Sequence, residues 1–171
     1  MTKYIADTDH YSQVIAQIPK VKRLLWIATA DLKDLYVKKK DGSVVPLLQV
    51  LNDLVKKGME VRLIHAKEPG TAFREDFDKY PALWGGMERR LCPRVHIKII
   101  VMDSELVYIG SANMTGAGMG MKSSANRNFE AGILTDEPGF IDSAMSHFDS
   151  IWEGTHCKTC GRKDFCHDKI R

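Results

Sequence analysis

His96 and Lys98 are the two residues whose types and spacing most directly suggest chemistry. They lie two positions apart in an apolar stretch, and residues i and i+2 of a β-strand point to the same face of a sheet. The alternate positions are apolar and are expected to face the core: Val95, Ile97, Ile99 and Val101. The spacing therefore predicts an imidazole and an ammonium group side by side on one surface of a buried strand.

A turn of small residues follows this strand. Residues 106–109 are predicted to form a short return strand, and the sequence Gly-Ser-Ala-Asn at positions 110–113 suits a strand-to-helix turn. Such a turn can direct backbone N–H groups at an anion. Together with the imidazole and the ammonium group, it indicates a phosphate-handling site.

The chemistry-bearing residues of this region form one spaced pattern, which reads His96-x-Lys98-x4-Asp103-x6-Gly110-x2-Asn113, with Ser111 inside the turn and Glu130 downstream. This pattern resembles the HKD motif of the phospholipase D superfamily in both order and spacing. The element order up to about residue 152 is compatible with that family. The resemblance implies an α/β fold, with a mixed β-sheet flanked by helices in an α-β-α sandwich and one copy per chain.

The resemblance also implies a role for each residue of the motif. His96 would be the nucleophile and would form a covalent phosphohistidine that water then hydrolyses, since a neutral imidazole is available near pH 7. Lys98 and Asn113 would bind phosphate oxygens, with Ser111 and the backbone amides of the turn contributing. Glu130 would hydrogen-bond one nitrogen of His96 and orient the other. Asp103 is expected to brace the strand turn rather than to touch the substrate.

The mechanism needs a second histidine as a general acid, and the sequence carries one copy of the motif. Family enzymes take this histidine from a second copy in the same chain or in a partner. The resemblance therefore implies a two-fold homodimer that brings together the two His96 side chains. His65 or His10 of the same chain are alternative donors. No cofactor is expected for catalysis, because the two lysines of the paired site would supply the positive charge.

Three functions are consistent with these residues. The favoured one is a metal-independent nuclease that cleaves DNA or RNA, because a symmetric site suits a repeating polymer. The second is a phospholipase D or phosphatidyl transferase acting on lipid headgroups, with Met114, Met119 and Met121 as a substrate-facing lip. The third is a non-catalytic nucleic-acid-binding subunit, which the intact motif disfavours. Further candidates for phosphate contacts are Arg89, Arg90, Arg94, Lys122 and Arg127.

The four cysteines suggest a second, separate site. Cys157, Cys160 and Cys166 lie within the last fifteen residues, and Cys157-x2-Cys160-Gly is typical of a zinc knuckle. We predict a structural zinc ion here, with an iron–sulfur cluster or reduced thiols as alternatives. The fourth ligand is predicted to be Cys92, with His167 as the alternative. The chain accordingly divides into a catalytic domain at residues 1–154 and a cysteine-rich tail at residues 155–171.

Composition is that of an ordinary globular protein. The chain has 171 residues, of which 44% are hydrophobic and 27% charged, with a net charge of +3, so charge alone neither requires nor excludes nucleic acid. No apolar run approaches the roughly 20 residues of a membrane span. The polar first residues lack the core of a signal peptide, which predicts a cytoplasmic protein without membrane contact.

The rest of the chain predicts the elements that would position the site. Apolar runs at residues 24–30 and 59–66 read as buried strands on either side of a helix at 46–57, which is a βαβ unit with parallel strands. Further helices are predicted at residues 11–18, 71–80 and 140–152. A strand at 129–135 would carry Glu130, and residues 82–94 are predicted to be an irregular link.

Overall fold

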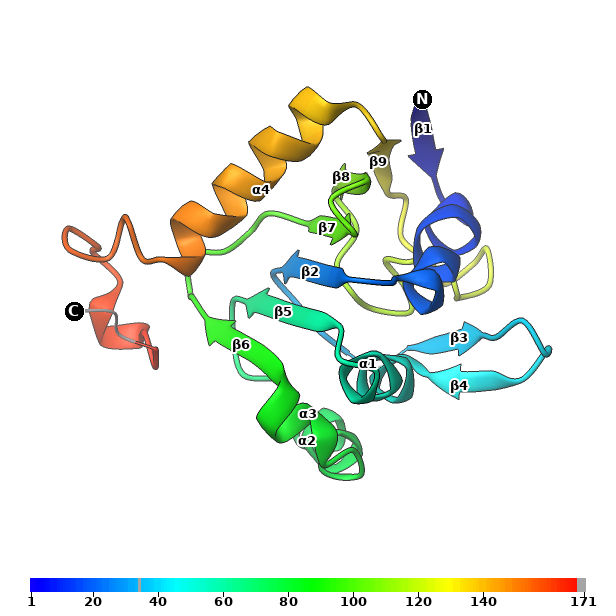
Figure 1. Ribbon diagram of the computed structural model, residues 1–171, viewed down its shortest axis with the longest axis horizontal. Coiled ribbons are helices and arrows are strands. Elements are labelled where there is room, and N and C mark those ends of the chain that lie inside the picture. Colours follow the sequence, from blue (N-terminus) through cyan, green and yellow to red (C-terminus); the bar gives the residue numbers. More distant parts are fainter. Residues whose placement is uncertain (34, 169–171) are drawn as a thin grey trace.

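The computed structural model describes residues 1–33 and 35–168 and shows one seven-stranded mixed sheet (Figure 1). The strand order is β1-β9-β8-β7-β2-β5-β6; β2, β5 and β6 run parallel to one another, and all other pairs are antiparallel. The strands are β1 (Thr2–Ala6), β2 (Leu24–Thr29), β5 (Glu60–His65), β6 (Met87–Leu91), β7 (Ile99–Met102), β8 (Leu106–Gly110) and β9 (Ala131–Thr135). A separate hairpin joins β3 (Tyr36–Lys38) to β4 (Val44–Pro46).

Helices cover both faces of the sheet, as the predicted sandwich requires (Figure 1). One face carries α4 (Pro138–Trp152). The other carries α1 (Leu47–Lys56), α2 (Thr71–Asp78), α3 (Ala82–Gly86), the π-helix η1 (His10–Val14) and the 3₁₀ helix η2 (Ile15–Lys20), whereas the short 3₁₀ helix η3 (Lys163–Phe165) belongs to the C-terminal segment. Within the described residues, no helix combines the length and apolar character that crossing a bilayer would demand.

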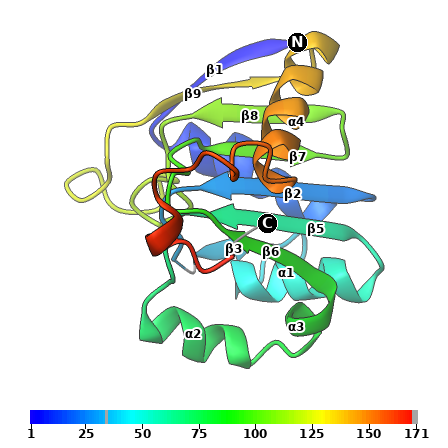
Figure 2. The same ribbon diagram turned by 90° about the vertical axis from the view of Figure 1, so that its left-hand side faces the viewer.

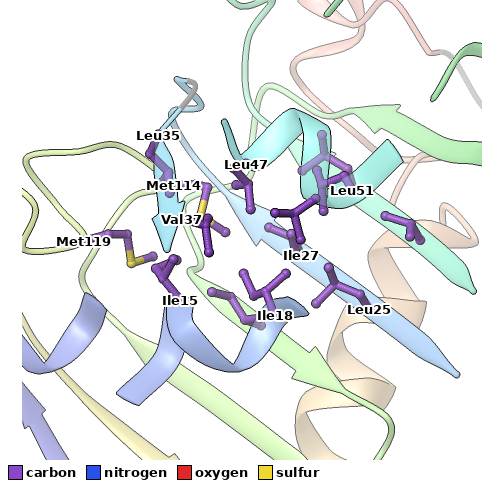
Figure 3. Packing of buried hydrophobic residues seen from close by; sticks show 14 of the residues in the cluster. Ile15, Ile18, Leu25, Ile27, Leu35, Val37, Leu47, Leu51, Met114 and Met119 are labelled. Atoms are coloured by element: carbon purple, nitrogen blue, oxygen red, sulfur yellow. The ribbon is translucent and has the colours of Figure 1, made fainter. Parts of the chain in front are cut away.

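Each face of the sheet has its own apolar core, because successive residues of a strand point to opposite faces. Leu25 and Ile27 of β2 pack into the larger cluster, together with residues of η2 and α1 (Figure 3). Trp26 and Ala28 of the same strand pack against α4 in the second cluster. This alternation makes β2 an interior strand that contributes to both cores of the sandwich.

The predicted βαβ unit is confirmed: β2 and β5 pair in parallel from Leu24 opposite Glu60 to Thr29 opposite His65, with α1 between them. The predicted irregular link at residues 82–94 is wrong, since it contains α3 and β6. The reason lies in the sequence Met-Glu-Arg-Arg-Leu of β6, whose three central charged residues hide the apolar alternation of a strand. Charged side chains are common on strands at the edge of a sheet, and β6 is an edge strand.

Candidate active site

His96 and Lys98 lie at the edge of the sheet where β2 and β5 end and β7 begins. The prediction that both belong to a strand is wrong, because β7 starts at Ile99. On the N-terminal side of Ile99 the pairing with β8 continues through one hydrogen bond, from the Gly110 amide to the Lys98 carbonyl (3.1 Å). The alternation of side chains nevertheless extends past the strand. Val95 and Ile99 are buried in the α4-side cluster, as predicted.

The two motif residues differ sharply in exposure. His96 is exposed, whereas Lys98 is only 6% exposed. The Lys98 Nζ lies 2.5 Å from the His96 carbonyl oxygen and 3.3 Å from its Nδ1. Burial lowers the pKa of Lys98, and the negative charge of Glu130 opposes this shift. The positive charge of Lys98 is thus buried and only partly balanced by Glu130. Behind an exposed imidazole, such a charge is well placed to attract an anion.

Ser111 and Glu130 are joined directly. The Ser111 hydroxyl donates to one carboxylate oxygen of Glu130, and the Asn128 side-chain amide donates to the other (3.0 Å). The Ala131 amide also donates to the Ser111 hydroxyl (3.1 Å), which fixes the serine at the start of β9. Glu130 therefore precedes β9 instead of lying in it, and among the described residues its oxygens bond Ser111 and Asn128 rather than His96.

Asn113 is held by the end of β2. Its Oδ1 accepts hydrogen bonds from the Asp31 amide (3.2 Å) and the Thr29 hydroxyl (3.4 Å). Thr29 also accepts from the Met114 amide (3.1 Å) and donates to the Asp31 carbonyl (2.8 Å). These bonds fix the amide plane and leave its NH2 group as the donor for a ligand. Sequence reasoning missed Thr29, because the contact joins segments far apart in the chain.

The turn at residues 110–113 rests on Tyr108. A Cβ atom on Gly132 would come 2.5 Å from the Tyr108 ring and 2.8 Å from the Ile109 carbonyl oxygen, and one on Gly110 would collide with the Tyr108 hydroxyl. That hydroxyl accepts from the Ala112 amide (3.4 Å), and burial raises the pKa of Tyr108 to about 12, so it stays neutral. The two glycines therefore let the turn lie directly on a rigid aromatic ring.

Asp103 lies at the opposite end of β7, in the turn to β8. Its carboxylate accepts hydrogen bonds from the backbone amides of Lys22 (3.0 Å), Arg23 (2.7 Å) and Leu24 (3.1 Å). Asp103 itself has a positive φ of 58°, which aspartate tolerates better than most residues. The residue ties the start of β2 to this turn and is separated from His96 by the whole strand.

A family model described as "Cardiolipin synthase, PLD-like domain" matches residues 14–152, which include every strand of the sheet except β1, the helices α1–α4 and every residue of the motif. The chain belongs to the phospholipase D superfamily. Members of this superfamily catalyse transfer or hydrolysis at phosphodiester bonds.

Relatives of the chain support the same assignment. It is 26% identical over 130 residues to cardiolipin synthase 1 of Staphylococcus aureus (strain COL), covering 69% of this chain and 25% of that protein, so it spans about a quarter of this relative. The fold is similar to NucT from Helicobacter pylori (TM-score 0.64, 17% identity, 90% and 97% of the two chains). It is also similar to Nuc from Salmonella typhimurium, a phospholipase D family member (TM-score 0.62, 19% identity, 89% and 93%).

The alternative proton donors are both enclosed in this phospholipase D fold. His10 is buried with its ring edge-on to Tyr108, and its Nδ1 lies 3.0 Å from the Asp7 carbonyl oxygen. His65 is buried at the end of β5, where burial lowers its pKa and keeps it neutral. Neither ring reaches the surface on which His96 lies.

His147 is a further histidine that the sequence pattern did not single out. It is exposed on α4 and lines a cavity of about 330 Å³ together with Lys98, Gly110 and Phe140. No motif spacing marks this residue, because it comes from the closing helix. Among the described residues that line this cavity, His147 is the only histidine.

The predicted methionine lip is not formed. Met114 and Met119 are buried in the larger core cluster, and Met121 packs against it (Figure 3). The physical reason is the glycine content of this segment: a side chain on Gly118 would meet the Asn113 backbone, and Gly120 has a positive φ of 71° against the Asp7 backbone. These close approaches turn the methionines inward.

The basic candidates divide into engaged and free residues. Arg89 lies 3.6 Å from Glu68, and Arg90 stacks over the Trp152 ring at 5.0 Å. Arg94 and Lys122 are exposed on the loops that flank the site. Arg94 also interacts with Cys160, so Lys122 is the better candidate for a contact with a phosphate backbone.

The cysteines gather near the same edge of the sheet. Cys166 donates a long hydrogen bond to the Leu91 carbonyl (3.9 Å), next to Cys92, and the Cys160 sulfur accepts from the Arg162 amide (3.4 Å). All four thiols are free and partly buried. Within residues 1–33 and 35–168, however, no three His, Cys, Asp or Glu side chains already surround a common metal position. The last three residues of the predicted tail, 169–171, lie outside the described residues.

Proposed function

We propose that this chain is a metal-independent phosphodiesterase that cleaves nucleic acid through a covalent phosphohistidine at His96. The observation that carries the proposal is the pairing of an exposed imidazole with a buried ammonium group at Lys98, flanked by the anchored amide of Asn113. An attacking nitrogen, a fixed positive charge and a preoriented donor are the parts that displacement at phosphorus requires.

Substrate binding would change the contacts of His96. In the present arrangement the Lys98 Nζ lies against Nδ1 of the imidazole, and Glu130 is occupied by Ser111 and Asn128. A phosphate oxygen would draw the ammonium group away and leave Nδ1 to donate to Glu130. The other ring nitrogen, Nε2, would then carry the lone pair that attacks phosphorus.

The leaving oxygen needs a proton donor, and we propose that it comes from His96 of a second copy. His10 and His65 are enclosed in the core, whereas His96 is open to an approaching partner. A two-fold axis beside the site would also add a second Lys98, which would stabilise the negative charge of the transition state without a metal. His147 is the competing donor within the same chain.

Nucleic acid is the preferred substrate class. Lys122 is exposed beside the site and would contact neighbouring phosphates, which a polymer supplies and a single lipid headgroup does not. Transfer on lipid headgroups is the second candidate, favoured by the similarity to cardiolipin synthase 1. The burial of Met114 and Met119 removes the apolar lip on which the lipid function was predicted to depend.

The test is cleavage of labelled single- and double-stranded DNA and RNA in excess EDTA, with anionic phospholipid vesicles as a parallel substrate. Wild type is expected to cut nucleic acid, His96→Asn to be inactive, and His147→Ala to remain active. Quenching the wild-type reaction with detergent at alkaline pH, where the N–P bond of a phosphohistidine is stable, should trap the phosphorylated protein. Cleavage by His96→Asn would refute the nucleophile, and headgroup release without nucleic-acid cleavage would establish the lipid function instead.

Mixing experiments test the shared site. Equal amounts of wild type and His96→Asn are unfolded and refolded together, so that the chains pair at random. If activity needs His96 from both copies, only the dimers of two wild-type chains, about one quarter of all dimers, should be active. If each chain acts alone, half of the activity should remain. Activity that falls only to half, or that is lost in His147→Ala, would place the proton donor within one chain.

A further inference from the structure

The segment of residues 155–168, called the tail below, turns only its cysteines inward. Cys157, Cys160 and Cys166 are partly buried, and every other residue of the tail is exposed, including Phe165 at 66%. Burying a phenylalanine removes far more apolar surface from water than burying a thiol, so a segment that folded around apolar contacts would enclose Phe165. The thiols of the tail are therefore arranged by something other than hydrophobic packing.

The first cysteine pair has the local geometry of a metal-binding turn. The Cys160 amide donates to the Cys157 carbonyl (3.2 Å), which closes a tight turn between the two thiols. The Arg162 amide then points at the Cys160 sulfur at 3.4 Å. A backbone N–H aimed at sulfur stabilises a thiolate, which is the form that binds a metal ion.

The third tail cysteine docks on the end of β6. Cys166 donates to the Leu91 carbonyl (3.9 Å), and the Leu91 amide donates to the Asp168 carboxylate (2.5 Å), so the tail holds both backbone groups of one residue. Cys166 interacts electrostatically with both Cys92 and Cys157, and Cys160 with Arg94. Figure 2 shows the tail in front of the sheet, on the face that α4 covers. Cys92, Cys157 and Cys166 thus lie near one another beside the β6–β7 loop, and Cys160 lies near Arg94 of that loop.

We propose that Cys92, Cys157, Cys160 and Cys166 bind one Zn²⁺ ion through four thiolates and so clasp the tail onto the β6–β7 loop. Four sulfur ligands favour a closed, tetrahedral structural zinc site. Because the thiols do not yet surround a common point, the ion must draw them together, and the exposed tail makes few contacts that would resist this. The positive charges of Arg94 and Lys163 lie near Cys160 and would offset the negative charge of the loaded site.

The thiol set is favoured over a histidine ligand. His156 and His167 are both exposed, whereas the neighbouring Cys157 and Cys166 are partly buried. Cys92 belongs to the catalytic domain and precedes His96 by four residues. Zinc at this position would fix the loop that presents the nucleophile, so the clasp would act as a positioning device for the proposed reaction without taking part in it.

Elemental analysis of protein purified under reducing conditions tests the proposal. We expect one zinc and no iron per chain in wild type, in His167→Ala and in His156→Ala. Cys92→Ser and Cys166→Ser should bind zinc at least 10–100-fold more weakly in competition with a chromophoric chelator, since even outer-shell changes cost about that much. His96→Asn should keep its zinc, which separates this test from that of the proposed phosphodiesterase.

A second measurement guards against misfolded variants. Far-UV circular dichroism should show the same folded domain in the serine variants, while limited proteolysis should remove the tail from them and spare it in zinc-loaded wild type. Zinc retained by Cys92→Ser but lost by His167→Ala would overturn the clasp in favour of a tail-only site. Iron, or a Cys92–Cys166 disulfide in metal-free protein, would overturn zinc binding itself.

Discussion

Replacing Thr29 by valine tests whether the hydroxyl that joins β2 to the active-site turn also sets the catalytic geometry. The side chain is 1% exposed, and its hydroxyl accepts from the Met114 amide and donates to the Asp31 carbonyl. Valine would leave both groups without their partner, which should cost about 2–3 kcal/mol of folding free energy. For a chain of this size that corresponds to a Tm lowered by about 4–12 °C.

The effect on catalysis should exceed the effect of lost stability. Of the two described hydrogen bonds to the Asn113 Oδ1, the one from the Asp31 amide would remain. The Asn113 NH2 group would then sample orientations away from the phosphate. Removing such a donor outright costs roughly 100–1,000-fold in kcat. Loosening it should cost about tenfold in kcat with little change in KM, measured on the nucleic-acid substrate well below the Tm.

Two matched variants separate positioning from stability. Thr29→Ser keeps the hydroxyl and should retain most of the activity. Thr135→Val removes an equally buried hydroxyl, which accepts from the Glu137 amide (3.1 Å) and contacts Thr2 (2.8 Å) at the far edge of the sheet. It should lower the Tm and leave kcat unchanged. An equal fall of kcat in Thr135→Val, or an unchanged kcat in Thr29→Val, would refute the reasoning.

Further predictions concern other residues of the site. Lys98→Met should abolish cleavage yet raise stability near pH 7 by about 1 kcal/mol, because a buried ammonium group is removed. Burial lowers the pKa of Lys98 in the folded state below its unfolded value of 10.5. The gain in stability of Lys98→Met over wild type should therefore be full at pH values below the folded-state pKa, where wild type buries a charge, and should vanish as the pH rises to 10.5. Urea titrations at several pH values measure it. Asp103→Ala should cost about 1–3 kcal/mol through three lost amide partners without lowering kcat per folded molecule, and an inactive but folded variant would contradict a bracing role. Gly132→Ala should lower the Tm, because the added Cβ collides with Tyr108, whereas Gly139→Ala has open space around it and should not. Equal Tm values of the two variants would contradict the close packing of Gly132 on the Tyr108 ring.

The sequence was most informative where chemistry and periodicity coincide. The spacing of the motif predicted the family correctly, and the alternation predicted the burial of Val95 and Ile99, whereas Ile97 is only partly buried. The strand boundary was wrong, because it depends on where the neighbouring strands stop pairing. Periodicity within β7 carries no information about that point.

The supporting contacts of the site could not be predicted from local patterns. Thr29 reaches Asn113 across 84 positions of the chain, and Tyr108 supports the turn only because β9 places Gly132 over its ring. The methionines after the turn were misinterpreted for a related reason. A glycine-rich stretch reads as a loose surface loop, yet here the glycines permit close backbone approaches that send Met114 and Met119 into the core.

The stack around Arg62 gives the protein an optical reporter of its own. The Arg62 guanidinium lies 4.8 Å from the Trp26 ring and 5.2 Å from the Trp152 ring, so two of the three tryptophans share one buried environment. The third, Trp84, is 67% exposed on α3. In a Trp84→Phe background, tryptophan fluorescence would therefore come only from Trp26 on β2 and Trp152 at the end of α4, which lie against the same guanidinium group. Because Trp152 directly precedes the tail, its emission would follow movement at that junction in real time, without an attached dye.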